Sequence, residues 1–333
     1  MQSLLTSGGA FTYQDRDIIN QALASLGIVT PGNVWWVRPY SGTDSLNGTN
    51  AGLTSQTAFK TLAFALSQAT ADQNDVVLLC AESNTAAKTT DYQSANLAWS
   101  KNGVHLVGVN AGTFCSPRSR ISNASAAASY ANLFTLSASG CLIYGIEFYH
   151  GAGSNTLSAA QTCVTVSGER NRFVNCAISG IGDTTLDYAG SNSLTVSNSE
   201  NIFQHCYIGL DTVIRATATY EVSITTAART IFEDCHFASY TSLTTWKAVN
   251  VASTADRFVK FRDCEFEAVQ NISSAAVPTG AIACASMNGS VMVIRPALVG
   301  YALLVTGGSA YVKTLSWQNA TTVQGVCASA AAS

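Results

Sequence analysis

Two aspartates occupy equivalent positions of a recurring sequence pattern and could form a catalytic pair. Asp234 and Asp263 each directly precede a cysteine, one repeat apart. If one repeat makes one turn of a stacked solenoid, their carboxyls lie about 5 Å apart, near the separation in retaining glycosidases. One carboxyl would then have a raised pKa. The favoured alternative is a polar corner column with Asn175 and His205, whose short side chains bond to the turning backbone.

A second column of polar side chains is predicted to point outward. It runs through Tyr207, His236 and Glu265, again one repeat apart. His236 and Glu265 could form an acid–base dyad, which needs this proximity. An exposed ion pair across two strands needs nothing more and is the favoured interpretation. Glu233 above Arg262 is interpreted in the same way.

The sequence also contains candidates for a metal site, for aromatic residues that could bind sugars and for reactive cysteines. A metal site at His205 and His236 would break the stack, because their neighbours Cys206 and Cys235 should point inward. Trp35, Trp36, Trp246 and Trp317 could be sugar platforms or could lie in an interface between subunits. We therefore predict no catalytic residues, metal or cofactor, and the binding site stays undefined. The cysteines form no C-x-x-C pair and are expected to be reduced, buried hydrophobes; they are Cys80, Cys115, Cys141, Cys163, Cys176, Cys206, Cys235, Cys264, Cys284 and Cys327.

The pattern that carries these residues is an internal repeat, F-x-x-C-x-[IF]. Its copies begin at Phe173, Phe203, Phe232 and Phe261, and their cysteines are 30, 29 and 29 residues apart. A degenerate copy begins at Ile143. A second strand, starting at Leu133, Cys163, Ser193 and Glu221, keeps the same period. Strands recurring at about thirty residues predict an all-β fold, a right-handed parallel β-helix of roughly eight coils between residues 75 and 320.

The rest of the chain is expected to close and decorate this solenoid. We predict an N-terminal arm over 1–33, with a helix at 18–26. An initial segment over 34–73 includes a capping helix at 59–70, the β-helix spans 74–320, and a tail spans 321–333. The variable stretches 183–193 and 211–220 are predicted to be loops that carry specific contacts.

The composition argues against binding to nucleic acid or to an anionic membrane. There are 17 Lys and Arg against 20 Asp and Glu, a formal charge of −3, so no long-range field gathers nucleic acid or an anionic membrane. Charged residues make up 11% of the chain, and a weakly charged surface favours a permanent assembly. The first residues lack the features of a signal peptide, so we expect the protein to be made and assembled in the cytosol.

Several motifs resemble those of a known family. The segments 35–39, 41–45, 57–62 and 75–77 resemble the N-terminal module of pectate-lyase-like β-helix proteins. Together with 168–182 and 232–237 they make the chain similar to β-helix proteins of tailed bacteriophage particles, in particular capsid-associated ones. The resemblance covers about residues 30–270. It implies a virion component, commonly a homotrimer.

From that resemblance we predict a structural role. The protein would be a capsid decoration (cement) protein on the capsid surface, bridging major capsid protein subunits, and not an enzyme. The N-T-D, D-D and G-H-G motifs of polygalacturonases are missing, and Arg118-Ser-Arg120 does not match the arginine strand of the lyases. The alternatives are a tailspike-type polysaccharide hydrolase or lyase, or a non-catalytic protein that binds a host surface glycan.

Overall fold

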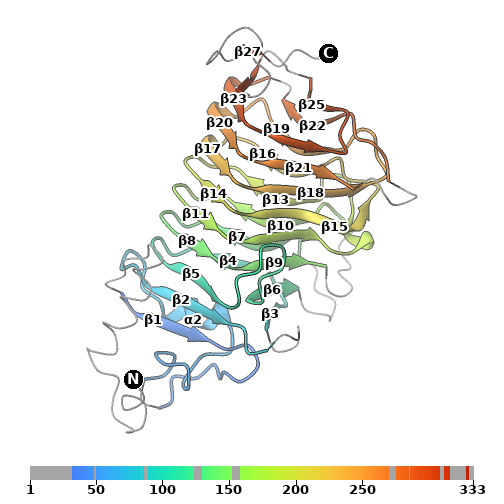
Figure 1. The fold of residues 1–333 in the computed structure, drawn as a ribbon. Coiled ribbons are helices and arrows are strands. Elements are labelled where there is room, and N and C mark those ends of the chain that lie inside the picture. The colour runs from blue at the N-terminus through green and yellow to red at the C-terminus, as the bar shows by residue number, and fades with distance from the viewer. Residues whose placement is uncertain are drawn as a thin grey trace.

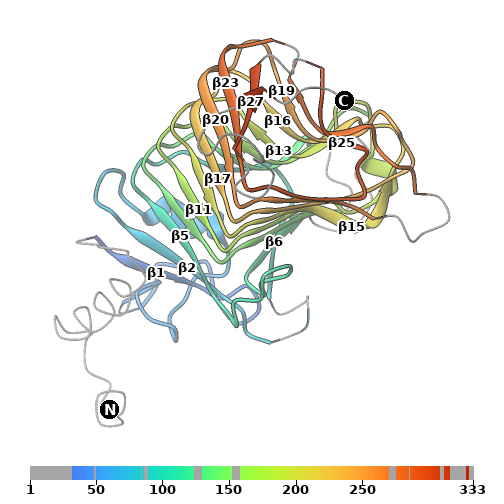
Figure 2. The same ribbon diagram turned by 45° about the horizontal axis from the view of Figure 1, so that its top comes forward.

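The chain forms a right-handed parallel β-helix (Figures 1 and 2). The structure, a computed structural model, describes residues 32–48, 50–83, 85, 89–123, 130–151, 158–269, 275–284, 286–307, 311–315 and 328–329. Each complete turn contributes one strand to each of three sheets, here called A, B and C, and sheet A has three further strands at its ends. Two of these sheets contain eight strands each, which agrees with the predicted solenoid of roughly eight coils.

The strands follow one another around each turn from sheet A to B to C. Sheet A contains β1 (Val34–Val37), β2 (Val76–Cys80), β5 (His105–Val109), β8 (Leu142–Tyr144), β11 (Arg172–Val174), β14 (Ile202–Gln204), β17 (Ala228–Glu233), β20 (Asp256–Arg262), β23 (Asn288–Ile294), β26 (Val312–Leu315) and the antiparallel β27 (Ala328–Ser329). Sheet B contains β3 (Thr90–Gln93), β6 (Arg120–Asn123), β9 (Glu147–His150), β12 (Ala177–Ile181), β15 (Tyr207–Arg215), β18 (His236–Thr241), β21 (Glu265–Ala268) and β24 (Ala297–Val299). Sheet C contains β4 (Leu97–Trp99), β7 (Asn132–Leu136), β10 (Thr162–Val166), β13 (Asn192–Val196), β16 (Tyr220–Ile224), β19 (Lys247–Val251), β22 (Gly280–Cys284) and β25 (Leu303–Thr306).

The repeated phenylalanines form the predicted column inside sheet A. Phe173, Phe203, Phe232 and Phe261 pair in register on neighbouring strands and are fully buried. The ring centroids of Phe203 and Phe232 are 4.7 Å apart and the rings are nearly parallel, at 8°. Stacked rings of this kind combine apolar burial with offset ring contact. This column confirms that residues one repeat apart are vertical neighbours.

The second repeated strand and most of the cysteines also behave as predicted. Val164 of β10 pairs with Phe134 on one side and with Leu194 on the other. Eight of the nine described cysteines are buried and free. Cys115 is the exception, because it lies exposed on the segment between β5 and β6. The prediction that all the cysteines are buried is therefore wrong for Cys115, and Cys327 lies outside the described residues.

A short helix closes the N-terminal end, as expected. Helix α2 (Leu62–Gln68) contacts β1 and β2 and is shorter than the predicted 59–70. It begins at Leu62 because the Thr61 side chain accepts a bond from the Phe64 N–H, which caps the helix. The buried carboxylate of Asp91 accepts the Leu62 N–H. The helix predicted at 18–26 lies outside the described residues.

Three details differ from the sequence-based expectations. Residues 211–215 are not a loop but extend β15, and 183–193 contains the 3-10 helix η2 (Thr184–Leu186) and the start of β13. Trp246 is fully buried, so it is neither a sugar platform nor part of an interface. Trp35 and Trp36 are half-buried, and Trp317 lies outside the described residues.

Within the described part of the chain, no helix is long and apolar enough to cross a membrane.

Candidate functional site

The predicted carboxylate pair lies at the corner between sheets A and B. Asn175, His205, Asp234 and Asp263 all have left-handed backbones, with φ between 50° and 54°. Asn and Asp tolerate this conformation better than most residues, which makes them suitable for a tight turn. The placement of these residues at a tight corner is therefore confirmed. Their predicted bonds to the turning backbone are not, because Asn175 bonds to the Tyr144 hydroxyl and Asp263 bonds to Arg295.

Each corner acid has a basic neighbour. Arg295 donates two hydrogen bonds to the Asp263 carboxylate. Its Nε lies 2.6 Å from Oδ1, and its Nη2 donates to Oδ2. Asp234 lies 3.8 Å from Nδ1 of His205. The bond from Arg295 lowers the pKa of Asp263, the opposite of what a proton-sharing pair requires. Asp263 is therefore an ion-paired corner residue and does not share a proton with Asp234.

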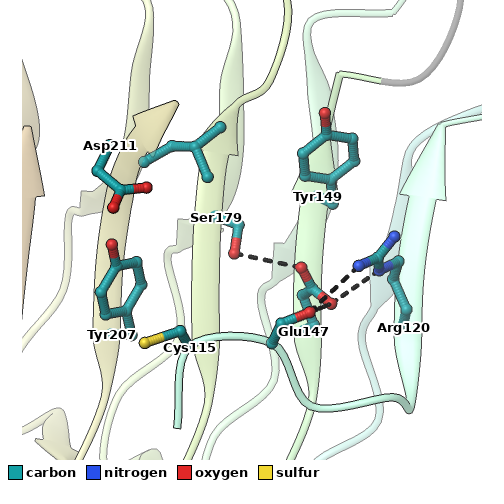
Figure 3. Close-up of a pocket in the computed structure, with 9 residues that line it drawn as sticks. Cys115, Arg120, Glu147, Tyr149, Ser179, Tyr207 and Asp211 are labelled. Carbon is teal, nitrogen blue, oxygen red and sulfur yellow. Dashed lines mark hydrogen bonds and ion pairs between the residues drawn. The ribbon is translucent and has the colours of Figure 1, made fainter. Parts of the chain in front are cut away.

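A hollow of about 410 Å³ lies on the outward face of sheet B (Figure 3). Strands β6, β9, β12 and β15 supply residues from four successive turns, and the segment between β5 and β6 supplies two more. The lining residues are Cys115, Ser116, Arg120, Glu147, Tyr149, Ser179, Tyr207, Leu210 and Asp211. The parallel register brings together side chains that are far apart in the sequence.

Glu147 is the best-anchored acid in the hollow. Its Oε2 accepts bonds from Arg120 Nε at 2.7 Å and Ser116 Oγ at 3.1 Å, and its Oε1 lies 3.4 Å from Ser179 Oγ. Arg120 and Glu147 are direct partners on β6 and β9, which explains their contact. The Arg120 guanidinium also lies 5.5 Å from the ring centre of Tyr149. Donors from three sides fix the orientation of this carboxylate.

Asp211 supplies a second carboxylate from β15, two strands away from Glu147 (Figure 3). No described basic side chain pairs with it. Burial raises the pKa of the Tyr207 hydroxyl, and the Asp211 charge raises it further. The pKa of the Cys115 thiol is raised in the same way, first by burial and then by Asp211. Asp211 is therefore an uncompensated charge at the rim of the hollow.

Rings and acids extend this face beyond the hollow. Tyr207 stacks on His236 with centroids 5.2 Å apart, and the exposed Phe114 meets Tyr207 edge-on at 5.9 Å. His236 Nδ1 lies 3.2 Å from Glu265 and Nε2 lies 2.9 Å from Glu267. The predicted contact between His236 and Glu265 is confirmed, and so is that between Glu233 and Arg262.

A buried ionic network anchors the C-terminal end of β15 at Arg215. Asp211 lies four residues earlier on the same strand. Arg215 Nε lies 2.8 Å from Asp187, and Nη1 lies 3.4 Å from Glu221. The Asp187 carboxylate also accepts the N–H groups of 216 and 217. Burial raises the pKa of Glu221, while Arg215 partly offsets that effect. This network explains why 211–215 is a strand extension with a fixed position.

Sequence reasoning missed both carboxylates of the hollow. Glu147 belongs to the degenerate copy of the repeat, which lacks the Phe and Cys that mark the others, and Asp211 fell in a predicted loop. Extending the outward column Tyr207–His236–Glu265 backward by whole repeats would have reached Ala177 and then Glu147. Among the residues that the structure describes, no group of His, Cys, Asp and Glu could hold a metal ion.

Several solved structures share this architecture. The chain is similar to a pectin methylesterase in complex with a hexasaccharide, with a TM-score of 0.50, 15% identity, and 88% of this chain and 91% of that chain covered. The pectin methylesterase PemA from Erwinia chrysanthemi gives 0.50 at 12% identity, covering 87% and 91%. A rhamnogalacturonan lyase gives 0.51 at 12%, covering 80% and 68%. No family model and no curated protein matches the sequence.

These similarities support the pectate-lyase-like β-helix fold and correct one prediction. The expectation that the chain is not an enzyme is wrong against this comparison, because the structures it resembles are an esterase and a lyase. The expectation rested on missing motifs, yet acids from different turns can meet on one sheet face without a linear motif. At 12–15% identity the likeness establishes the fold, and the substrates named are those of the other proteins.

Proposed function

We propose that this protein is a polysaccharide-cleaving enzyme that binds a glycan along the outward face of sheet B and acts on it at the hollow. The observation that carries the proposal is the presence of Glu147 and Asp211 in one hollow, beside Arg120 and two tyrosines. Paired carboxyls on either side of a bound sugar are the usual requirement for cleaving a glycosidic bond. This is the tailspike-type alternative reached from the sequence, with Glu147 and Asp211 in place of the Asp234–Asp263 pair considered there.

The two carboxyls differ in a way that suits two roles. Glu147 is oriented by Arg120 and Ser116 and would act as the base that takes a proton from water. Asp211, at the open rim, would donate a proton to the glycosidic oxygen as the C–O bond breaks, and for this role it must first take up a proton once a bound sugar shields it from water. Water then supplies the new hydroxyl on the sugar carbon, so one water is consumed for each bond cleaved.

The test is release of oligosaccharides from a panel of pectic and bacterial surface polysaccharides. Glu147→Gln and Asp211→Asn should each lower the rate of release by about 10²–10⁴-fold. Asp234→Asn and Asp263→Asn are matched controls, because they remove the same charge from the corner and should cleave like the wild type. Cleavage that survives both hollow variants would contradict the assignment. Binding without any cleavage would favour the non-catalytic glycan-binding alternative.

The predicted capsid-decoration role gains no support from the fold comparisons. A virion location, a homotrimeric state and contact with the major capsid protein remain proposals that rest on the sequence resemblance. A polysaccharide-active protein on a phage particle would be compatible with a virion location. Mass spectrometry of purified particles and the solution mass of the protein would test these proposals.

A further inference from the structure

The strands of sheets A and B carry opposite charge. The sheet A strands contain Arg172, Arg229, Arg257, Lys260, Arg262 and Lys313 against Glu233 and Asp256. The described strands of sheet B contain Asp91, Glu147, Asp211, Glu265 and Glu267 against Arg120 and Arg215. Pairs of Arg229 with Glu200, Arg257 with Asp256 and Arg262 with Glu233 partly offset the charge of sheet A. A soluble polyanion would still meet more basic side chains along sheet A than along sheet B.

The two arginines of sheet B do not offset the outward acids. Arg120 is engaged by Glu147, and Arg215 is buried against Asp187 and Glu221. Arg118, on the segment before β6, is not among the residues that line the hollow.

The acids that remain on this face are Asp211, Glu265 and Glu267, with His236 against the last two. Burial raises the pKa of the Cys115 thiol, and the Asp211 charge raises it further; this second contribution agrees with a negative potential in the hollow. The face is therefore acidic where a ligand would approach.

We propose that the glycan accepted by this face lacks carboxylate groups. The inference rests on the proposed function and names its substrate class. A uronate beside Asp211 would place like charges together at the partly desolvated hollow, and one beside Glu265 would do the same on the adjoining part of this face. Such like-charge contacts are an effective way to reject a ligand. A neutral sugar can donate its hydroxyls to the same carboxylates and pack its apolar side on the exposed ring of Phe114.

The potential can be measured without knowing the ligand, because Cys115 is exposed and lines the hollow. The rates of its modification by a cationic and an anionic methanethiosulfonate reagent of similar size are compared, with Cys115→Ser as background. We expect the cation-to-anion rate ratio to exceed that of a free thiol about ten-fold at low salt, and to fall in high salt. A ratio equal to or below that of the free thiol overturns the inference.

Variants assign the potential to the named acids. Asp211→Asn, and separately the double change Glu265→Gln with Glu267→Gln, should lower the ratio toward the free-thiol value. Asp263→Asn removes an acid from the corner instead and should leave the ratio unchanged. An equal drop in the corner variant would show that overall charge, and not this face, sets the ratio.

Ligand class is tested with one oligogalacturonide in its fully methyl-esterified form and after saponification. Protection of Cys115 from a neutral thiol reagent reports occupancy of the hollow alone, even if the acidic form binds sheet A. We expect the esterified form to protect at concentrations roughly ten-fold or more below the saponified form. Equal or better protection by the acidic form refutes the inference but leaves the proposed function standing. If neither form protects, the rate ratio decides the inference, and the cleavage panel independently decides the proposed function.

Discussion

The corner between sheets A and B and the outer face of sheet B both carry acids one or two turns apart, but the acids do different work. At the corner, the Asp263 carboxylate is bound by Arg295, and the backbone at Asp234 and Asp263 is left-handed. On sheet B, Glu147 is held by neighbours on adjoining turns, and Asp211 has no described basic partner. Glu147 and Asp263 are both paired with an arginine, so the difference lies in placement: the corner acids sit on separate left-handed turns, whereas Glu147 and Asp211 face one hollow.

The largest effect expected from this comparison is on catalysis. Glu147→Gln and Asp211→Asn should each lower the cleavage rate by about 10²–10⁴-fold, the usual contribution of a general acid or base. The corner variants Asp234→Asn and Asp263→Asn should stay within about two-fold of the wild type. Initial rates of reducing-end release measure both. A comparable loss in the corner variants would erase the distinction between the two regions.

The interior of sheet A should dominate stability. Phe232 stacks on Phe203 and on Phe261 and is fully buried. Phe232→Ala should lower the free energy of unfolding by about 3–5 kcal/mol, since it leaves a cavity in a closed column. Chemical denaturation measures the change, and Phe114→Ala, at an exposed ring, is the control with little effect. A small loss at Phe232 would mean that the column relaxes around the gap.

The buried ionic network of Arg215, Asp187 and Glu221 should affect both the stability of the protein and the activity of the hollow. Arg215→Met would leave the buried carboxylates of Asp187 and Glu221 without their cation, at a cost of about 3–5 kcal/mol. The variant should also lose cleavage activity at temperatures where it is still folded, because the end of β15 is no longer anchored. Activity and thermal unfolding measured on one preparation separate these effects. Full activity in a folded variant would show that Asp211 does not depend on Arg215.

A buried acid at the N-terminal end of sheet B should make stability depend on pH. Burial raises the pKa of Asp91 to about 6. The folded state then holds a proton that the unfolded state has already released, so stability falls as pH rises from about 4 to 6, by roughly 3 kcal/mol in total. Asp91→Asn should remove this part of the pH dependence. Urea titrations of both proteins across that range measure the difference, and parallel curves would contradict it.

The smallest expected effect is at the corner itself. The lowered pKa of Asp263 places its stabilising contribution above its unfolded pKa, and the contribution is lost as pH falls through the folded value. Because the pair with Arg295 is exposed to solvent, Asp263→Asn should lower stability by less than about 1 kcal/mol. Thermal unfolding at neutral pH measures it. A large loss would mean that the turn depends on the carboxylate and not only on the left-handed backbone.

Much of the fold could be predicted from the sequence, and little of the site. The thirty-residue period fixed the stacking of Phe203 on Phe232, the register of the second strand and the contact of His236 with Glu265. Those features follow from one rule, that equivalent residues lie one above another. The rule did not predict the positions of Glu147 and Asp211, because the repeat is degenerate at β9 and because residues 211–215 are predicted to be a loop.

By itself the sequence determined the solenoid, its inward columns and its polar corner, because each depends only on local spacing repeated along the chain. The tertiary structure alone decided which acids face one hollow and which are neutralised. That outcome depends on where the segment before β6 lies and on the buried cation at Arg215, which holds the end of β15. Contacts between irregular segments do not recur at a fixed spacing, so they cannot be predicted from the repeat in the sequence.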